Sequence, residues 1–185
     1  MRIIAGTHGS RRFEAPAGKQ TRPTLDKVKE AVFSSLGGFF SGGAVLDLYA
    51  GSGGIGFEAL SRGMDKAVFV DHSRDAVRVI KKNIEQLGFA ERAAVLPIRA
   101  EAAIRQLAKK GQTFDLVYLD PPYRLQENVH VVEQLISGGL LGRNAVVVIE
   151  SLKEESFPER IGSLVRYKEA VYGITRISYY KMSGE

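Results

Sequence analysis

Residues 44–56, AVLDLYAGSGGIG, determine the fold that we expect for this chain. The first six of them are mostly apolar and predict a strand buried on both faces, and a glycine-rich turn follows at once. Gly51, Gly53 and Gly56 match the pattern G-x-G-x-x-G, and Asp71 lies 20 residues after Gly51. This spacing is typical of a strand–turn–helix unit whose glycines let the backbone approach a nucleotide-like ligand, while the acidic residue binds ribose hydroxyls.

The rest of the chain alternates short apolar runs with amphipathic segments. Further strands are predicted at 67–71, 93–98, 114–120 and 145–150, and helices at 54–62, 73–87, 100–110 and 125–137. This alternation predicts an α/β fold of Rossmann-like type, with a mostly parallel, doubly wound sheet. Residues 164–181 instead predict an antiparallel hairpin around Gly173. Ligands of such sheets bind beyond the carboxyl ends of the strands, where Asp47, Asp71 and Asp120 are expected.

The first 36 residues follow a different pattern. Glycines and prolines break residues 2–22 into short pieces, which predicts a small β-hairpin or loop arm. Thr24 is the predicted N-cap of a helix that ends at Gly37 and Gly38. The apolar face of this helix is expected to consist of Leu25, Val28, Val32 and Leu36.

The composition is that of an ordinary globular protein. The 185 residues fit one domain, which we divide into a basic arm at 1–23 and a Rossmann-like core at 24–185. No apolar run approaches the ~20 residues that span a bilayer, so we expect a cytoplasmic protein with no membrane partner. We also expect a monomer. Cysteine is absent, which excludes a thiolate nucleophile. The three histidines are too scattered to predict a metal site.

The net charge of +5 is unevenly distributed. Residues 1–29 carry seven basic and two acidic side chains, whereas the remaining 156 residues carry 19 of each sign. A basic block on a neutral body suggests a phosphate-rich partner such as nucleic acid, although such a block can also serve only to keep a protein soluble. We choose Arg11, Arg12 and Arg22 as the candidate RNA contacts.

Asp47 helps to distinguish between the possible ligands of the glycine loop. The loop can be a purely structural turn, or it can hold the pyrophosphate of a nicotinamide dinucleotide. It can also hold the amino-acid part of S-adenosylmethionine. A carboxylate just ahead of the loop is unfavourable beside a pyrophosphate but suits the ammonium and sulfonium groups of S-adenosylmethionine. Asp47 therefore favours a methyltransferase.

The tetrad Asp120-Pro121-Pro122-Tyr123 ends the strand predicted at 114–120. It can be a simple turn, but its chemistry fits an exocyclic amine, whose lone pair is delocalised into a base ring. The carboxylate of Asp120 and the carbonyl of Pro121 can accept the amine hydrogens, and the prolines fix the direction of that carbonyl. Tyr123 can stack on the base. Methyl transfer then needs mainly positioning and electrostatics.

These motifs resemble a known family. DLYAGSGGIG, VFVD and LDPPY resemble S-adenosylmethionine-dependent methyltransferases that modify exocyclic amines. Together with MRIIAG and TRPTLDKVKEAVFSSL at the N-terminus, they resemble the RsmD family of 16S ribosomal RNA guanine-N2 methyltransferases over nearly the whole chain. The resemblance implies S-adenosylmethionine as the cofactor and a guanine of 16S rRNA, in partly assembled small ribosomal subunits, as the substrate.

The resemblance also implies roles for particular residues. The tetrad Asp120, Pro121, Pro122 and Tyr123 would hold the guanine. The cofactor would be held by Asp47, Tyr49, Gly51, Gly53, Gly56, Asp71, His72 and Glu101. Glu101 replaces the aspartate that such enzymes often place near the adenine amino group, and it can equally be a solvated carboxylate in the first turn of a helix.

Four alternatives differ in what they leave unexplained. An adenine-N6 methyltransferase acting on DNA or RNA is the nearest, but that class usually has asparagine before the two prolines. A dehydrogenase does not account for the tetrad and the basic arm. A non-catalytic RNA-binding module does not account for the loop, Asp71 and the tetrad together. Cytosine-C5 methylation is excluded because there is no cysteine.

Overall fold

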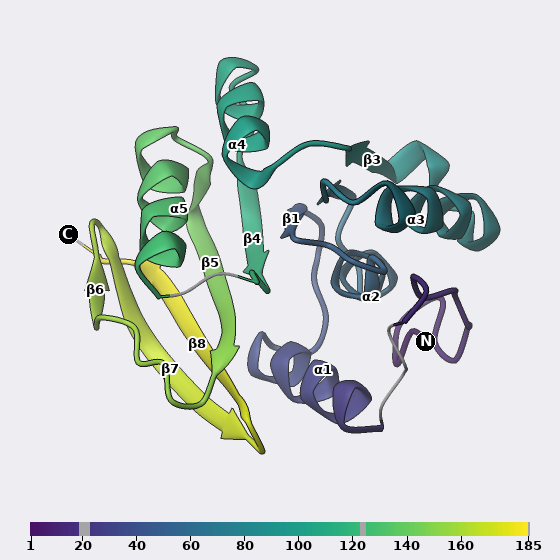
Figure 1. The fold of residues 1–185 in the computed structure, drawn as a ribbon, viewed down its shortest axis with the longest axis horizontal. Coiled ribbons are helices and arrows are strands. Elements are labelled where there is room, and N and C mark those ends of the chain that lie inside the picture. Colours follow the sequence, from purple (N-terminus) through teal and green to yellow (C-terminus); the bar gives the residue numbers. More distant parts are fainter. Residues whose placement is uncertain (19–22, 123–124, 185) are drawn as a thin grey trace.

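The computed structural model describes residues 1–18, 23–122 and 125–184. Within them, one sheet has the strand order β3-β2-β1-β4-β5-β8-β7-β6 (Figure 1). The strands are β1 (Ala44–Leu48), β2 (Lys66–Val70), β3 (Ala93–Leu96), β4 (Phe114–Leu119), β5 (Leu141–Leu152), β6 (Arg160–Ile161), β7 (Leu164–Tyr172) and β8 (Thr175–Met182). The helices are α1 (Pro23–Ser35), α2 (Gly54–Ser61), α3 (Arg74–Leu87), α4 (Ala100–Lys109) and α5 (Leu125–Ser137), with a short 3₁₀ helix, η1 (Ala90–Arg92).

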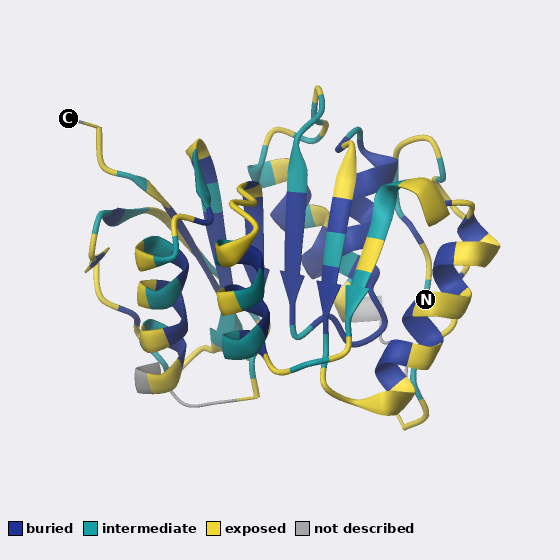
Figure 2. Ribbon diagram, turned by 90° about the horizontal axis from the view of Figure 1, so that it is seen from above, coloured by how far each residue is buried: buried dark blue, intermediate teal, exposed yellow. Residues whose placement is uncertain are grey.

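The parallel strands β1 to β5 form the doubly wound part of the sheet, which confirms the predicted fold class. Helices α1, α2 and α3 pack on one face and α4 and α5 on the other (Figures 1 and 2). Helix α2 is almost entirely buried, whereas α3 and α4 bury an apolar side and expose a polar one. The hairpin of β7 and β8 is antiparallel, as predicted, and β8 pairs with β5. In the described part of the chain, no helix has the length and apolar character needed to cross a membrane.

Four predicted element boundaries differ from the structure by two residues or more: the start of α1, the end of β3 at Leu96 and both ends of β5, which extends to Leu152. Helix α1 begins at Pro23, so Thr24 lies inside the helix and does not cap it. Strand β5 begins at Leu141 and not at residue 145, because β4 pairs with it across an irregularity: Phe114 faces Leu141, whereas Leu116 faces Val146. The early part of β5 contains polar residues that interrupt the apolar pattern, so the sequence did not predict that the strand begins there.

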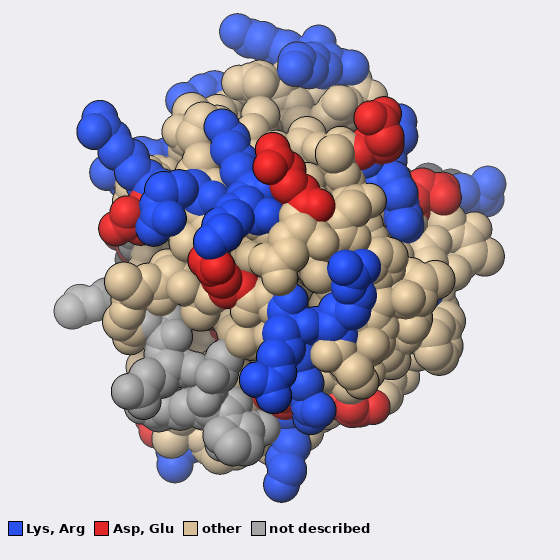
Figure 3. Space-filling view, turned by 90° about the vertical axis from the view of Figure 1, so that its right-hand side faces the viewer, with Lys and Arg blue, Asp and Glu red and all other residues tan. Residues whose placement is uncertain are grey.

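The N-terminal arm, residues 1–14, folds back on itself and is docked on the core. A single antiparallel bridge joins Arg2 to Arg12, so the predicted hairpin has no regular ladder. Ile3 is fully buried and Phe13 is 4% exposed, and both belong to the core on the α1–α2–α3 face. At the turn, Gly6 lies against the carbonyl of Ser61, where a Cβ would clash at 1.9 Å. The face made by the arm and α3 carries many lysine and arginine side chains (Figure 3).

A buried ion cluster fixes the arm, α1 and α2 together. Glu58 of α2 is fully buried and accepts hydrogen bonds from the backbone N–H groups of Ile4 at 2.9 Å and Ala5 at 3.1 Å. The Nε of Arg62 donates to the same carboxylate at 2.8 Å, and the Nζ of Lys29 lies 3.4 Å from it. Buried charges persist only when they are paired and hydrogen-bonded, so this cluster also fixes where its three segments lie.

We expect Glu58→Gln to lower the free energy of unfolding by ~3–5 kcal/mol, because it leaves Lys29 and Arg62 as buried charges without a counterion. Urea denaturation measures this change. The matched control is Glu14→Gln, which removes an exposed ion pair with Lys82 and should cost at most ~1 kcal/mol. Equal losses in the two variants would show that the buried cluster has no special role.

Candidate active site

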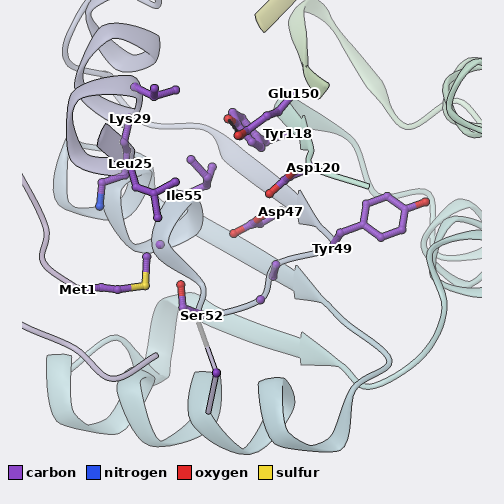
Figure 4. A pocket seen from close by; sticks show the side chains of 15 residues that line it. Met1, Leu25, Lys29, Asp47, Tyr49, Ser52, Ile55, Tyr118, Asp120 and Glu150 are labelled. Atoms are coloured by element: carbon purple, nitrogen blue, oxygen red, sulfur yellow. Dashed lines mark hydrogen bonds between the residues drawn. The ribbon is translucent and has the colours of Figure 1, made fainter. Parts of the chain in front are cut away.

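A cavity of about 680 Å³ opens at the carboxyl ends of β1, β4 and β5, beneath α1 and the start of α2 (Figure 4). Its described lining contains three carboxylates, from Asp47, Asp120 and Glu150, and a single cationic side chain, Lys29. The apolar part of the wall comes from the arm, α1 and α2, through Met1, Leu25, Val28 and Ile55. The site is therefore acidic on the sheet side and largely apolar on the helix side.

Asp47 occupies the centre of this cavity. Its side chain is 2% exposed, and its Oδ2 accepts the backbone N–H of Gly56 at 3.0 Å, in the first turn of α2. Burial raises the pKa of Asp47 well above its ordinary value, and the carboxylates of Asp120 and Asp71 raise it further, while the hydrogen bond from Gly56 opposes the shift. Asp47 is thus an electrostatically costly carboxylate in a site that a cationic ligand would stabilise.

The glycines of the loop divide into two groups. Gly51 and Gly54 line the cavity. Gly53 has φ 84° and lies against Phe57, and a Cβ on Gly56 would lie 2.2 Å from the ring of Phe69. The described structure therefore explains Gly53 and Gly56 by close helix–strand packing, and their predicted contact with a cofactor stays a prediction.

Asp71 follows β2 and supports the loop. Its Oδ2 accepts the N–H of Gly51 and its Oδ1 accepts the N–H of Ser73, each at 2.9 Å. His72 beside it is exposed, and Glu101 is half-buried in the first turn of α4. Asp71, His72 and Glu101 follow β2 and β3, outside the described lining of the cavity, so their roles toward a ribose and an adenine stay predictions.

The tetrad begins where predicted, directly after β4. Asp120 enters the cavity above Asp47, and Pro121 and Pro122 continue the chain as a non-helical segment (Figure 4). Tyr123 lies outside the described residues. Tyr49 also lines the cavity but has the left-handed φ of 60°, and its ring points away from Asp47.

Four polar residues of the cavity wall were not predicted, namely Lys29, Ser52, Tyr118 and Glu150. Lys29 reaches it from α1, and burial lowers its pKa while Glu58 opposes the shift. Tyr118 and Glu150 come from β4 and β5, and the Tyr118 hydroxyl donates to Glu150 Oε2 at 2.6 Å. Burial raises the pKa of both members of this pair. Glu150 ends a predicted strand, as Asp120 does. This shared position was the feature of the sequence that could have identified Glu150 as a site residue.

The candidate RNA contacts lie on the docked arm. Arg11 is exposed and donates to the carbonyl of Gln86 at 3.3 Å, at the end of α3, while Arg12 is exposed beside it. Arg22 lies outside the described residues. Exposed cations continue along α3 as Arg74, Arg78, Lys81 and Lys82. No group of three or more His, Asp or Glu side chains that could hold a metal ion was found among residues 1–18, 23–122 and 125–184.

Comparison with known proteins identifies relatives over the whole chain. Residues 1–181 match the family described as Conserved hypothetical protein 95. YlbH of Bacillus subtilis (strain 168) is 40% identical over 184 residues, 100% of each chain. Ribosomal RNA small subunit methyltransferase D of Escherichia coli (strain K12) is 30% identical over 188 residues, 100% of this chain and 91% of that one. The solved structure of yhhF from Escherichia coli has a TM-score of 0.87 and 30% identity, and the match covers 100% of this chain and 99% of that chain.

The strand order, the C-terminal antiparallel hairpin and the glycine turn at the end of β1 define the fold class of the S-adenosylmethionine-dependent methyltransferases. The length and identity of the matches are more specific than the fold. The chain belongs to the family described as Conserved hypothetical protein 95, which is the RsmD family, and the resemblance seen in the sequence is confirmed.

Proposed function

We propose that this protein transfers a methyl group from S-adenosylmethionine to the exocyclic N2 amine of a guanine in 16S rRNA of the small ribosomal subunit. The observation that carries the proposal is the placement of Asp47 and Asp120 in one cavity beside the glycine turn. Ribosomal RNA small subunit methyltransferase D, the name of the relative in Escherichia coli, supports the RNA substrate.

The residues of the cavity fit S-adenosylmethionine, which when bound supplies an electrophilic methyl on a sulfonium. The described lining holds three carboxylates and one cationic side chain. A ligand with ammonium and sulfonium charges would offset the burial, and the smaller repulsion by Asp120 and Asp71, that raise the pKa of Asp47. Asp47 and Gly51 would hold the methionine part. Asp71 would bind the ribose, because each of its oxygens accepts one backbone N–H and keeps a further lone pair. Glu101 is proposed for the adenine.

The base-binding side of the cavity begins at Asp120. Its carboxylate would accept one hydrogen of the exocyclic amine, and the carbonyl of Pro121 would accept the other, which directs the nitrogen lone pair toward the methyl. The amine proton becomes acidic as the nitrogen gains positive charge, so Asp120 can take it without being a strong base. The described residues would thus act mainly by orienting the amine and by stabilising developing charge.

The cofactor part of the proposal is tested with Asp47→Asn. The amide keeps an acceptor for Gly56, and removing a buried charge whose pKa is raised should leave the melting temperature at neutral pH equal or higher. Affinity for S-adenosylmethionine should fall about tenfold to a hundredfold, as expected for losing a charged hydrogen bond. Calorimetry and thermal denaturation measure both, with the exposed Asp75→Asn as control. Tight NADH binding without S-adenosylmethionine binding would instead indicate a dehydrogenase.

The role of Asp120 is tested separately. Asp120→Ala should leave cofactor affinity nearly unchanged and lower turnover by ~10²–10³, because it removes a contact made to the amine in the transition state. The assay uses labelled S-adenosylmethionine with unmodified small subunits, followed by nucleoside analysis. N2-methylguanosine as the product supports the proposal, whereas N6-methyladenosine would establish the adenine alternative. Wild-type turnover in the variant would show that the tetrad is only a structural turn.

The arm is tested through the salt dependence of RNA binding. Changing Arg11 and Arg12 together to Gln should weaken binding to ribosomal RNA and flatten the slope of log affinity against log salt by roughly 1–1.5, since each phosphate contact to a single strand contributes about 0.7. The control changes Lys109 and Lys110 to Gln, an exposed pair at the end of α4. If the salt slope of the arginine variant equals that of the lysine control, the RNA site lies elsewhere.

A further inference from the structure

A second carboxylate stands beside Asp120 in the cavity. Leu119 of β4 pairs with Ile149 of β5, so Asp120 and Glu150 are the next residues on two neighbouring parallel strands. Neighbouring strands lie roughly 5 Å apart. Both side chains line the same cavity and extend to its sheet side (Figure 4). The structure therefore presents two carboxyl groups side by side where the base is expected.

Tyr118 holds Glu150 in this position. The Tyr118 ring is 2% exposed on β4, and its hydroxyl donates to Glu150 Oε2 at 2.6 Å. A hydroxyl donor favours the ionised form of a carboxylate, and here it opposes the effect of burial, which raises the pKa of Glu150. One donated hydrogen bond leaves further lone pairs on the carboxylate. Glu150 is thus presented to the cavity as an oriented acceptor.

Guanine and adenine differ at the ring nitrogen beside the exocyclic amine. Guanine N2 and adenine N6 can be superposed so that the N1 atoms of the two bases also coincide. Guanine carries a hydrogen on N1 and presents two adjacent donors, whereas adenine carries a lone pair there and presents a donor and an acceptor. Two adjacent carboxylates match the guanine edge and repel the N1 lone pair of adenine.

We propose that Glu150 accepts the N1–H of the target guanine while Asp120 accepts a hydrogen of its N2 amine, so that Glu150 sets the preference for guanine over adenine. The inference rests on the proposed guanine-N2 function. It adds that Glu150, on the strand next to Asp120, takes part in recognising the base. A purely structural Glu150 would only satisfy the buried hydroxyl of Tyr118, and the two roles predict different responses to a change at N1 of the base.

The test compares guanine with 2-aminopurine, which keeps the 2-amino group but lacks both the hydrogen on N1 and the oxygen at C6. The comparison of wild type with a Glu150 variant isolates the N1 contact, because the missing oxygen affects both enzymes alike. Small subunits are reconstituted with RNA that carries either base at the methylated position, after that position has been mapped with the wild-type enzyme. Wild-type kcat/KM should be about tenfold to a hundredfold lower for 2-aminopurine, because a charged acceptor loses its donor. In Glu150→Gln the ratio should fall to about threefold or less, since the amide can rotate to donate to N1.

The control is Glu154→Gln, the same chemical change on an exposed glutamate after β5, which should keep the wild-type ratio. If Glu150→Gln lowers activity on both bases by one factor and leaves the ratio unchanged, Glu150 is structural and the inference is overturned. If the wild-type enzyme forms no N2-methylguanosine in small subunits, the proposed function itself fails. The two failures are therefore distinguishable.

Discussion

The buried carboxylate of Glu58 is the constraint on which the site depends. It is fully buried, and its oxygens are shared by the backbone of the arm, by Lys29 of α1 and by Arg62, which directly follows α2. These three segments are distant in the sequence, yet together they form the helix-side wall of the cavity. An uncompensated charge in this position would cost several kcal/mol, so the cluster permits essentially one arrangement of the wall. The position of the arm is therefore part of the architecture of the active site.

The sheet side of the cavity is positioned by strand pairing and not by a buried ion cluster. Parallel strands bring their carboxyl ends to one edge. Asp47, Asp120 and Glu150 meet there because Asp47 and Glu150 lie near the ends of β1 and β5 and Asp120 directly follows β4. Burial raises the pKa of Asp47, the carboxylates of Asp120 and Asp71 raise it further, and both effects lower the stability of the empty site. The arrangement is understandable if the site is built for a cation and for the donors of a base edge, since both would stabilise charges that the fold alone does not compensate.

The sequence predicted the elements well where periodicity was strong, as in the helices at 73–87 and 100–110, which the structure places at α3 and α4 within one residue at each end. It also placed Asp47 and Asp120 at strand ends. The sequence-based prediction failed where contacts between distant segments determine the structure. Strand β5 continues through polar residues because β4 pairs with it. Lys29 lines the pocket from α1, and its buried ion pair with Glu58 joins that helix to α2. Glu150 was overlooked because strand register, which makes it a neighbour of Asp120, is not evident from spacing along the chain.

The strand order has a consequence for how the protein is made. Strand β8, at Thr175–Met182, lies between β5 and β7, and its Tyr179 and Tyr180 are fully buried. During synthesis the exposed edge of β5, whose inner residues are apolar, has no native partner until these late residues leave the ribosome. Pairings of this kind over long sequence separation are slow to form, and an open apolar edge can associate with other chains. The nascent protein thus completes this part of its sheet only after β8 has been synthesised, and chains released before that point would be candidates for chaperone binding or degradation.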